Sequence, residues 1–201
     1  MVASNQLTYR ITGKAPLILH NARLSDPLNR YTKLVSEISS KRKKTEDDLI
    51  EMARREFLGS LYTADRDDET HAGAPVIPGA NLERMFIDAA KKFKMGPKAK
   101  AGLFVHDDDP ILIEYEGPKS AEGMWAKGSE FALRASCKVG MSRVIRTRPR
   151  FHSWALTFTV TYDRQMLDES DLHRFMDTAS DMIGLGDWRP KHGRFSWEVA
   201  K

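Results

Sequence analysis

The chain has 201 residues, of which 41% are hydrophobic and 30% are charged, and its formal net charge is +4. This apolar content, with four Trp, nine Phe and five Tyr, excludes a wholly disordered chain. No apolar run reaches the roughly 18 residues of a membrane span, and no signal-peptide pattern precedes Leu7. We therefore expect a single cytoplasmic domain over residues 1–201 with no membrane partner. The lone cysteine, Cys137, excludes an internal disulfide and a multi-cysteine zinc site, and we interpret it as a small buried hydrophobe.

The first third of the chain predicts one strand and a helical insertion. Apolar and polar residues alternate over 7–13, which is typical of a half-buried strand. Ser25-Asp26-Pro27 predicts the start of a helix, and Thr45 with Asp48 resembles a capping box at the start of a second one. Together they predict a helical insertion over residues 25–74.

The middle of the chain predicts a helix followed by strands. Pro78-Gly79 introduces a helix that Asn81 could cap, and residues 91–100 are interpreted as a basic connection. Strands are expected at 103–105, 111–115 and 131–139.

The last third carries the clearest alternation. Apolar residues recur at every second position over 154–162, which predicts a strand with one buried face. A helix capped by Asp168 or Ser170 follows, and a final strand is expected at 195–199. Without its insertion, the order is βαββαβ, so we predict an α+β fold with a ferredoxin-like (RRM-like) core.

The strongest candidate for chemistry is a row of arginines. In an extended segment Arg146, Arg148 and Arg150 lie on one side at a repeat of about 6.6 Å, close to the spacing of phosphates along a nucleic-acid strand. Arg143 and Lys138 precede them. Arginine suits phosphate because its fork donates two parallel hydrogen bonds. A solubilising hairpin that pairs with acidic clusters is the alternative.

A second candidate is the glycine-rich stretch over 184–195. Its glycines allow positive φ and close backbone approach, so that exposed amides can hold phosphate oxygens. Arg189, Lys191 and Arg194 add positive charge, and Trp188 could stack on a base.

The stretches at 78–82 and 184–195 resemble a known family. Pro78-Gly79-Ala80-Asn81-Leu82 is similar to the "PGSSLKG"-type start of the first helix in the CRISPR-associated RAMP superfamily, and the second stretch resembles that superfamily's glycine-rich loop. The likeness is greatest to the backbone subunits of CRISPR effector complexes. Asn81 and Glu83-Arg84 stand where the family has serine and lysine-glycine, so the contacts of those side chains are not carried over.

This resemblance implies a fold and a role. It implies that residues 138–153 form a thumb-like basic hairpin and that the chain binds single-stranded RNA of the crRNA type without cleaving it. It also implies partners: further copies of the chain, or other effector subunits, joined head to tail in a ribonucleoprotein. No cofactor or metal is expected. A solitary copy that binds and inhibits a host effector complex is one alternative.

Catalysis is the other alternative, because repeat-processing ribonucleases of the same superfamily often use a histidine near the first helix. His20, His192 and Arg194 are the residue types that RNA cleavage needs, but no spacing rule joins them. Three consecutive aspartates at 107–109 could hold magnesium, although a solvated turn is favoured.

We therefore predict a non-catalytic binder of single-stranded RNA that contacts mainly phosphates. The predicted contact residues are all basic except one aromatic: Lys41, Arg42, Lys43, Lys44, Lys138, Arg143, Arg146, Arg148, Arg150, Trp188, Arg189, Lys191 and Arg194.

Overall fold

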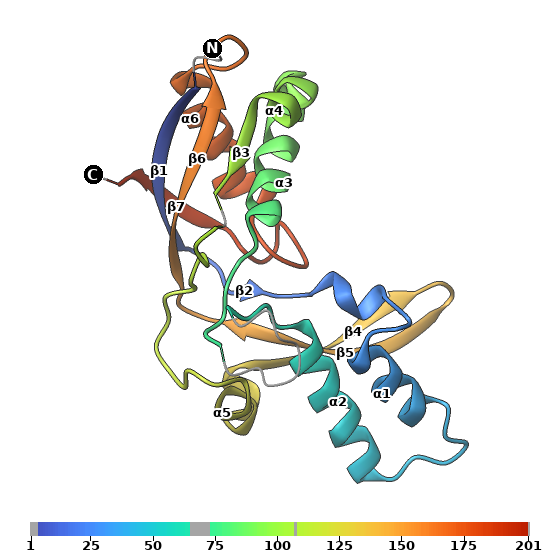
Figure 1. Cartoon of the computed structure of the whole chain (residues 1–201). Helices are drawn as coiled ribbons and strands as arrows, with labels where there is room; N and C mark the ends of the chain where they lie inside the picture. Colours follow the sequence, from blue (N-terminus) through green and yellow to red (C-terminus); the bar gives the residue numbers. More distant parts are fainter. Residues whose placement is uncertain (1–3, 65–72, 107, 201) are drawn as a thin grey trace. The chain divides into compact units, whose positions relative to one another are not determined.

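The computed structural model describes residues 4–64, 73–106 and 108–200. In this part of the chain it is an α+β protein with two antiparallel sheets and six α-helices (Figure 1). The chain divides into two compact units, each assembled from separate segments. The first unit comprises Met1–Leu17, Val76–Glu116 and His152–Lys201, and the second comprises Ile18–Pro75 and Gly117–Phe151.

The first unit is built on a four-stranded sheet. Strand β1 (Ser4–Gly13) pairs antiparallel with both β6 (Ala155–Asp163) and β7 (Phe195–Val199). Strand β3 (Leu103–Val105) pairs antiparallel with β6, so that the strand order is β3-β6-β1-β7. The two longest strands are therefore central, where both edges of each are paired.

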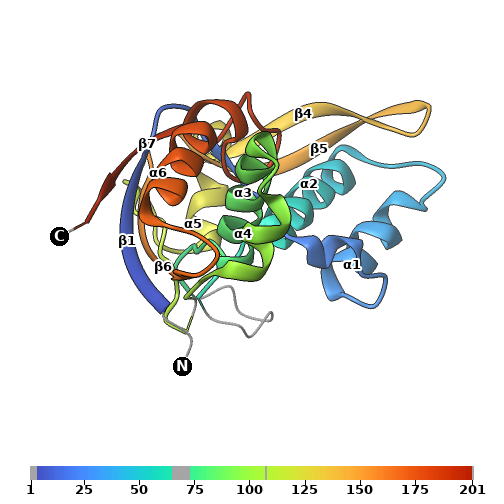
Figure 2. The ribbon, with the colours of Figure 1, turned by 90° about the horizontal axis from the view of Figure 1, so that it is seen from above.

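Helices cover one face of this sheet. They are α3 (Gly79–Ala90), α4 (Gly96–Gly102) and α6 (Glu169–Thr178), and both views place α3 and α6 on the same side of the strands (Figures 1 and 2). The alternation predicted for 154–162 is confirmed, because each of its apolar side chains is buried. The buried side chains of this strand form one core with apolar residues of the other elements: Ile11, Leu82, Met85, Phe86, Leu172, Phe175 and Met176.

Tyr9 lies at the centre of this core and supports a prediction about stability. Its side chain is fully buried among Phe86, Phe158 and Trp197, and its hydroxyl has no hydrogen-bond partner among the described residues. Burial, with a smaller contribution from the charge of Glu169, raises the pKa of Tyr9. Removing an unsatisfied buried hydroxyl is favourable, so Tyr9→Phe should stabilise the first unit by about 1 kcal/mol at neutral pH.

The gain from Tyr9→Phe should grow in alkali. A tyrosine in the unfolded chain ionises near pH 10, before the buried one does, so the unfolded state binds fewer protons and the wild type loses stability as pH rises. Urea unfolding of both proteins at neutral pH and at about pH 10.5 measures this. A phenylalanine variant less stable than the wild type would reveal a partner for the hydroxyl.

The second unit combines a three-stranded sheet with helices. Its strand order is β2-β5-β4, with β2 at Leu17–Ile18, β4 at Ala132–Val139 and β5 at Ser142–Phe151. The helices are α1 (Arg30–Ser39), α2 (Glu46–Ser60) and α5 (Ala121–Ala126). Helix α2 packs against both α1 and β5, as Figure 1 shows.

Short helical turns complete both units. In the second unit 3₁₀ turns cover Ala22–Ser25 and Gly128–Glu130. In the first unit a 3₁₀ turn at Lys91–Phe93 follows α3, and a π-helical turn at Ala179–Ile183 extends α6.

The start of each predicted helix was tested by the structure. The capping box of Thr45 and Asp48 is confirmed, and Asp168 caps α6 in a second box with Asp171. Two predicted starts are wrong. Asn29, not Ser25, caps α1, and α3 begins directly after Pro78, so that Asn81 lies inside the helix.

Two stretches have a different structure from the one predicted. The basic connection over 91–100 includes α4, because Pro97 occupies the first turn, where its fixed φ favours a helix. Residues 111–115 form no strand; they make only isolated bridges, between Val76 and Leu112 and between Glu114 and Ala155.

Candidate nucleic-acid interface

The glycine-rich loop of the first unit is held closed by its backbone. It follows the π-helical turn and runs to β7, and Gly184, Gly186 and Gly193 have φ of 74°, 81° and 72°, as the sequence predicted. The amide of Leu185 donates to the carbonyl of Gly193 at 2.9 Å, and the amide of Gly193 donates to the carbonyl of Pro16 at 2.9 Å. The neck of the loop is therefore tied to the segment that follows β1.

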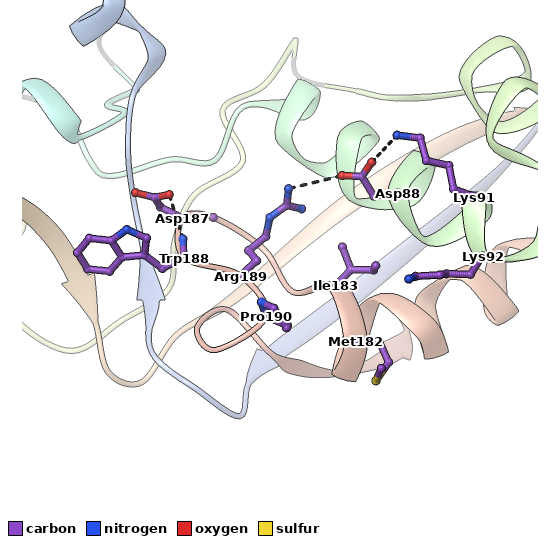
Figure 3. Close-up of a pocket in the computed structure, with 10 residues that line it drawn as sticks. Asp88, Lys91, Lys92, Met182, Ile183, Asp187, Trp188, Arg189 and Pro190 are labelled. Carbon is purple, nitrogen blue, oxygen red and sulfur yellow. Dashed lines mark hydrogen bonds and ion pairs between the residues drawn. The ribbon is translucent and has the colours of Figure 1, made fainter. Parts of the chain in front are cut away.

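A hollow of about 750 Å³ lies beside this loop (Figure 3). One wall comes from the end of α3 and the turn after it, with Asp88, Lys91 and Lys92, and another comes from the π-helical turn. The loop closes it with Gly186 to Pro190. Charged groups from segments about 100 residues apart in sequence thus share one concave surface.

Asp88 is the hub of the charges in this hollow. Its carboxylate accepts hydrogen bonds from Lys91 Nζ at 2.8 Å and Arg84 Nε at 3.0 Å, and Arg189 Nη2 lies 3.5 Å away. Partial burial acts to raise the pKa of Asp88, but the hydrogen bonds from Lys91 and Arg84 outweigh it and lower the pKa. Asp88 is therefore ionised at neutral pH and fixes three cations around one negative charge.

Trp188 and Arg189 are neighbours in sequence but point in different directions (Figure 3). Arg189 reaches toward Asp88, and its Nη1 also donates to the carbonyl of Gly184 at 3.4 Å. Trp188 has φ of 53°, which is unusual for a bulky residue, and its ring lies 6.2 Å from that of His192. The indole is half-buried and points away from Asp88, although Trp188 is among the residues that line the hollow (Figure 3).

Three further cations of the first unit are exposed. Lys191 and Arg194 lie on the loop, and Lys92 lines the hollow; no hydrogen bond or ion pair joins their side chains to other described residues. Sequence reasoning missed Arg84, Asp88, Lys91 and Lys92 as site residues. The spacing of Arg84, Asp88 and Lys91 along α3 and its C-cap was the available signal, because i,i+4 and i,i+3 positions share a face.

The arginine row of the second unit faces its own unit. Arg146 Nη1 donates to Glu56 Oε1 at 2.6 Å, and Arg148, which is only 8% exposed, donates through Nη1 to Ser60 Oγ at 3.3 Å. Arg150 donates to the carbonyl of Ser129. Their alternation on β5 is as predicted, but α2 and the turn at Gly128–Glu130 already occupy these guanidinium groups.

The outer part of the hairpin is different. Lys138 and Arg143 are exposed and directly opposite each other in the register of β4 and β5, and Arg134 is exposed on β4. Like charges that face each other repel, so an anion bound between Lys138 and Arg143 would relieve the repulsion. Cys137, expected to be buried, is half-buried on β4.

The basic run Lys41, Arg42, Lys43 and Lys44 links α1 to α2, and all four side chains are exposed. Lys41 Nζ lies 2.5 Å from Asp48 Oδ1, and Lys44 Nζ donates to the carbonyl of Lys41 at 2.9 Å. The Lys41 contact and the hydrogen bond from the Thr45 amide lower the pKa of Asp48. Arg42 and Lys43 are in no ion pair with a described residue.

The candidate catalytic groups are distributed over both units. His20 is half-buried in the second unit, whereas His192 and Arg194 belong to the first. Asp107 lies outside the described residues, and Asp108 is exposed with Oδ2 3.8 Å from Nδ1 of His106. Within the described ranges, no group of three or more His, Cys, Asp or Glu side chains is placed to hold a metal ion.

Two further findings bear on the class of protein. In comparisons with known proteins, neither a family model nor a curated protein matches this chain. Over the residues that the structure describes, no helix is long and apolar enough to cross a membrane. The arrangement of the basic side chains is therefore the basis for a functional proposal.

Proposed function

We propose that this chain is a non-catalytic subunit that binds single-stranded RNA through the hollow beside its glycine-rich loop. The observation that carries the proposal is the concentration of cations there. Arg84, Lys91 and Arg189 surround Asp88, and Lys92, Lys191 and Arg194 are exposed nearby. Cations outnumber carboxylates on this surface, and a phosphate backbone is the ligand that such a field attracts.

The topology of the first unit supports a ferredoxin-like core as part of this proposal. Apart from the short helix α4, which follows α3, its elements have the chain order β1, α3, β3, β6, α6 and β7, and all strand pairs are antiparallel. That is a βαββαβ order, which RNA-binding RAMP proteins share by the resemblance noted above. In this proposal the second unit corresponds to the helical insertion and the thumb-like hairpin.

Assembly with further copies, or with other subunits of a CRISPR-type effector complex in the cytoplasm, is also proposed. The link between α1 and α2 supports it, because Arg42 and Lys43 are exposed beside the exposed carboxylates of Glu46 and Asp47. A surface with both signs can join copies head to tail. The same surface could instead bind a host effector complex and block it. An assembling subunit should form filaments with other copies of the chain, whereas an inhibitor of a host complex should not.

The salt dependence of RNA binding tests the interface. Replacing Lys92, Lys191 and Arg194 with alanine should reduce the slope of log K against log salt by about 2, because each phosphate contact on a single strand contributes about 0.7. Binding of a fluorescent oligouridine to the full chain, measured by anisotropy over a range of salt concentrations, gives this slope.

A matched control exists in the same unit. Lys98, Lys100 and Arg164 are also exposed and in no described ion pair, so their triple alanine variant removes the same charge elsewhere. Its slope should remain close to that of the wild type. Equal slopes for the two triple variants would show that the loop is not part of the RNA interface. A wild-type chain that binds no single strand would refute the proposal.

A further inference from the structure

The second unit contains a pocket of about 800 Å³ between α1, α2 and β5. Its walls are largely aliphatic, with Val35 from α1, Leu49 and Met52 from α2, and Val144 and Ile145 from β5, and they also include His20, Arg146 and Arg148. Hydroxyl groups of serine and threonine residues lie among them. A pocket of this size and composition, with a few fixed polar groups, is the usual form of a site for a small ligand.

Glu56 supplies the fixed polar group of this pocket. The residue is 3% exposed, and its two carboxylate oxygens are held from different sides. Oε1 accepts a hydrogen bond from Arg146 Nη1 at 2.6 Å, and Oε2 accepts one from the amide of Thr147 at 2.9 Å. Each carboxylate oxygen can accept more than one hydrogen bond, so Glu56 remains a preorganised double acceptor beside a guanidinium donor.

The geometry points to a single guanine base as the occupant of this pocket. Among the four bases only guanine presents two adjacent donors, N1–H and N2–H₂, next to an acceptor, O6, on its Watson–Crick edge. Two adjacent donors match the oxygens of Glu56, and the acceptor matches the guanidinium of Arg146. The aliphatic walls contact the faces of the base, as in sites that accept a base taken out of its stack.

This inference rests on the proposed function, because the base belongs to a single strand of RNA. Strand β5 forms a wall of the pocket, and its outer end carries Arg143 opposite Lys138, where the adjoining phosphates would lie. Arg146 of β5 then has a role that the phosphate row predicted from sequence did not include: it positions Glu56 and contacts the base. RNA binding by the chain should accordingly favour strands that contain guanine.

Mononucleotide binding tests the pocket without any RNA strand. Guanosine, inosine and adenosine 5′-monophosphates are titrated into the full chain and followed by calorimetry and by NMR shifts of the Thr147 amide. Inosine lacks the N2 amino group, so it should bind about tenfold more weakly than guanosine monophosphate, and adenosine monophosphate more weakly still. Equal affinities for all three nucleotides, or no binding of the guanine nucleotide, would overturn the proposal.

Two tryptophan variants, one in α1 and one at its C-cap, sharpen the test. Val35→Trp fills the pocket and should abolish guanine binding, whereas Ser40→Trp places the same indole at the exposed end of α1, outside the lining, and should leave binding unchanged. Circular dichroism of both variants checks that each is folded. Retention of guanine binding by Val35→Trp would contradict the assignment.

The pocket and the proposed function can fail separately. Salt-dependent binding of oligouridine with no affinity for guanosine monophosphate would refute the pocket and leave the glycine-loop interface intact. Binding of guanosine monophosphate that is lost in Val35→Trp, without any binding of single strands, would establish the pocket as a site for free nucleotides. It would also refute the proposed RNA-binding role. Displacement of the nucleotide by octanoate, with no preference among bases, would assign the pocket to aliphatic ligands instead.

Discussion

Replacing Glu56 with leucine is expected to lower the free energy of unfolding of the second unit by about 2–4 kcal/mol. The substitution leaves Arg146 without its buried partner and removes the acceptor of the Thr147 amide, which is itself buried. Removing one member of a buried pair is costly because the other charge stays desolvated. The guanidinium of Arg146 is about a third exposed, which keeps the expected loss below that of a fully buried pair.

A double-mutant cycle separates the two causes. Arg146→Met in the Glu56→Leu background removes the orphaned charge, so the double variant should recover about 1–2 kcal/mol, but the Thr147 amide remains without an acceptor. Glu56→Gln retains an acceptor for that amide and should cost less than leucine. Hydrogen exchange of the Thr147 amide and urea unfolding give both quantities.

Glu51 provides the matched control for this cycle. It lies on the same helix but is more than a third exposed, where it pairs with Arg54 and Arg55. Glu51→Leu should change stability by less than about 1 kcal/mol, because exposed ion pairs contribute little. Additive effects of the Glu56 and Arg146 substitutions would show that their hydrogen bond carries no coupling energy.

This ion pair also shows what the sequence could and could not predict about the candidate site. The period of two along β5 correctly indicates that Arg146 and Arg148 share a side of the strand, since the alternation is a local property of extended backbone. It does not indicate what that side faces. Glu56 and Ser60 lie about 90 residues away in sequence, and only the tertiary fold brings them to β5.

The same distinction explains the outcome for the fold. Capping boxes depend on residues three apart, and both Thr45 with Asp48 and Asp168 with Asp171 are formed. Residues 111–115 carry a plausible strand pattern, yet a strand also needs a partner along its length, and only isolated bridges form there. The division into two units likewise depends on contacts between segments that are distant in sequence.

The Asp88 cluster was missed for a related reason. The sequence shows Arg84, Asp88 and Lys91 as an ordinary charged helix face, because i,i+4 ion pairs are common on exposed helices. What distinguishes this helix face is Arg189, because the closed glycine-rich loop brings its guanidinium to the same Asp88 carboxylate (Figure 3). A binding surface built from a helix and a distant loop has no compact sequence motif, whereas the loop itself does.

The loop therefore supports the second large prediction: Gly193→Ala should destabilise the first unit by about 3 kcal/mol or more. Gly193 has φ of 72°, and a Cβ atom there would lie 1.7 Å from the carbonyl oxygen of Leu185. That oxygen is backbone and cannot move without opening the neck of the loop. The left-handed conformation alone costs an L-residue about 1–2 kcal/mol, and relief of the clash must add to it.

Gly140 gives a control in which only the backbone conformation matters. Its φ is 58°, but a Cβ atom would meet nothing within 4 Å, so Gly140→Ala should cost about 1 kcal/mol. Hydrogen exchange of the Leu185 amide, which donates to Gly193, reports opening of the neck directly.

Because the neck holds Arg189, Lys191 and Arg194 in place, Gly193→Ala should also weaken oligouridine binding at least tenfold at low salt. Gly193→Ala with full RNA affinity but a destabilised loop would mean that the cations bind phosphate without the closed loop, so that charge alone, and not the loop's geometry, determines the interface.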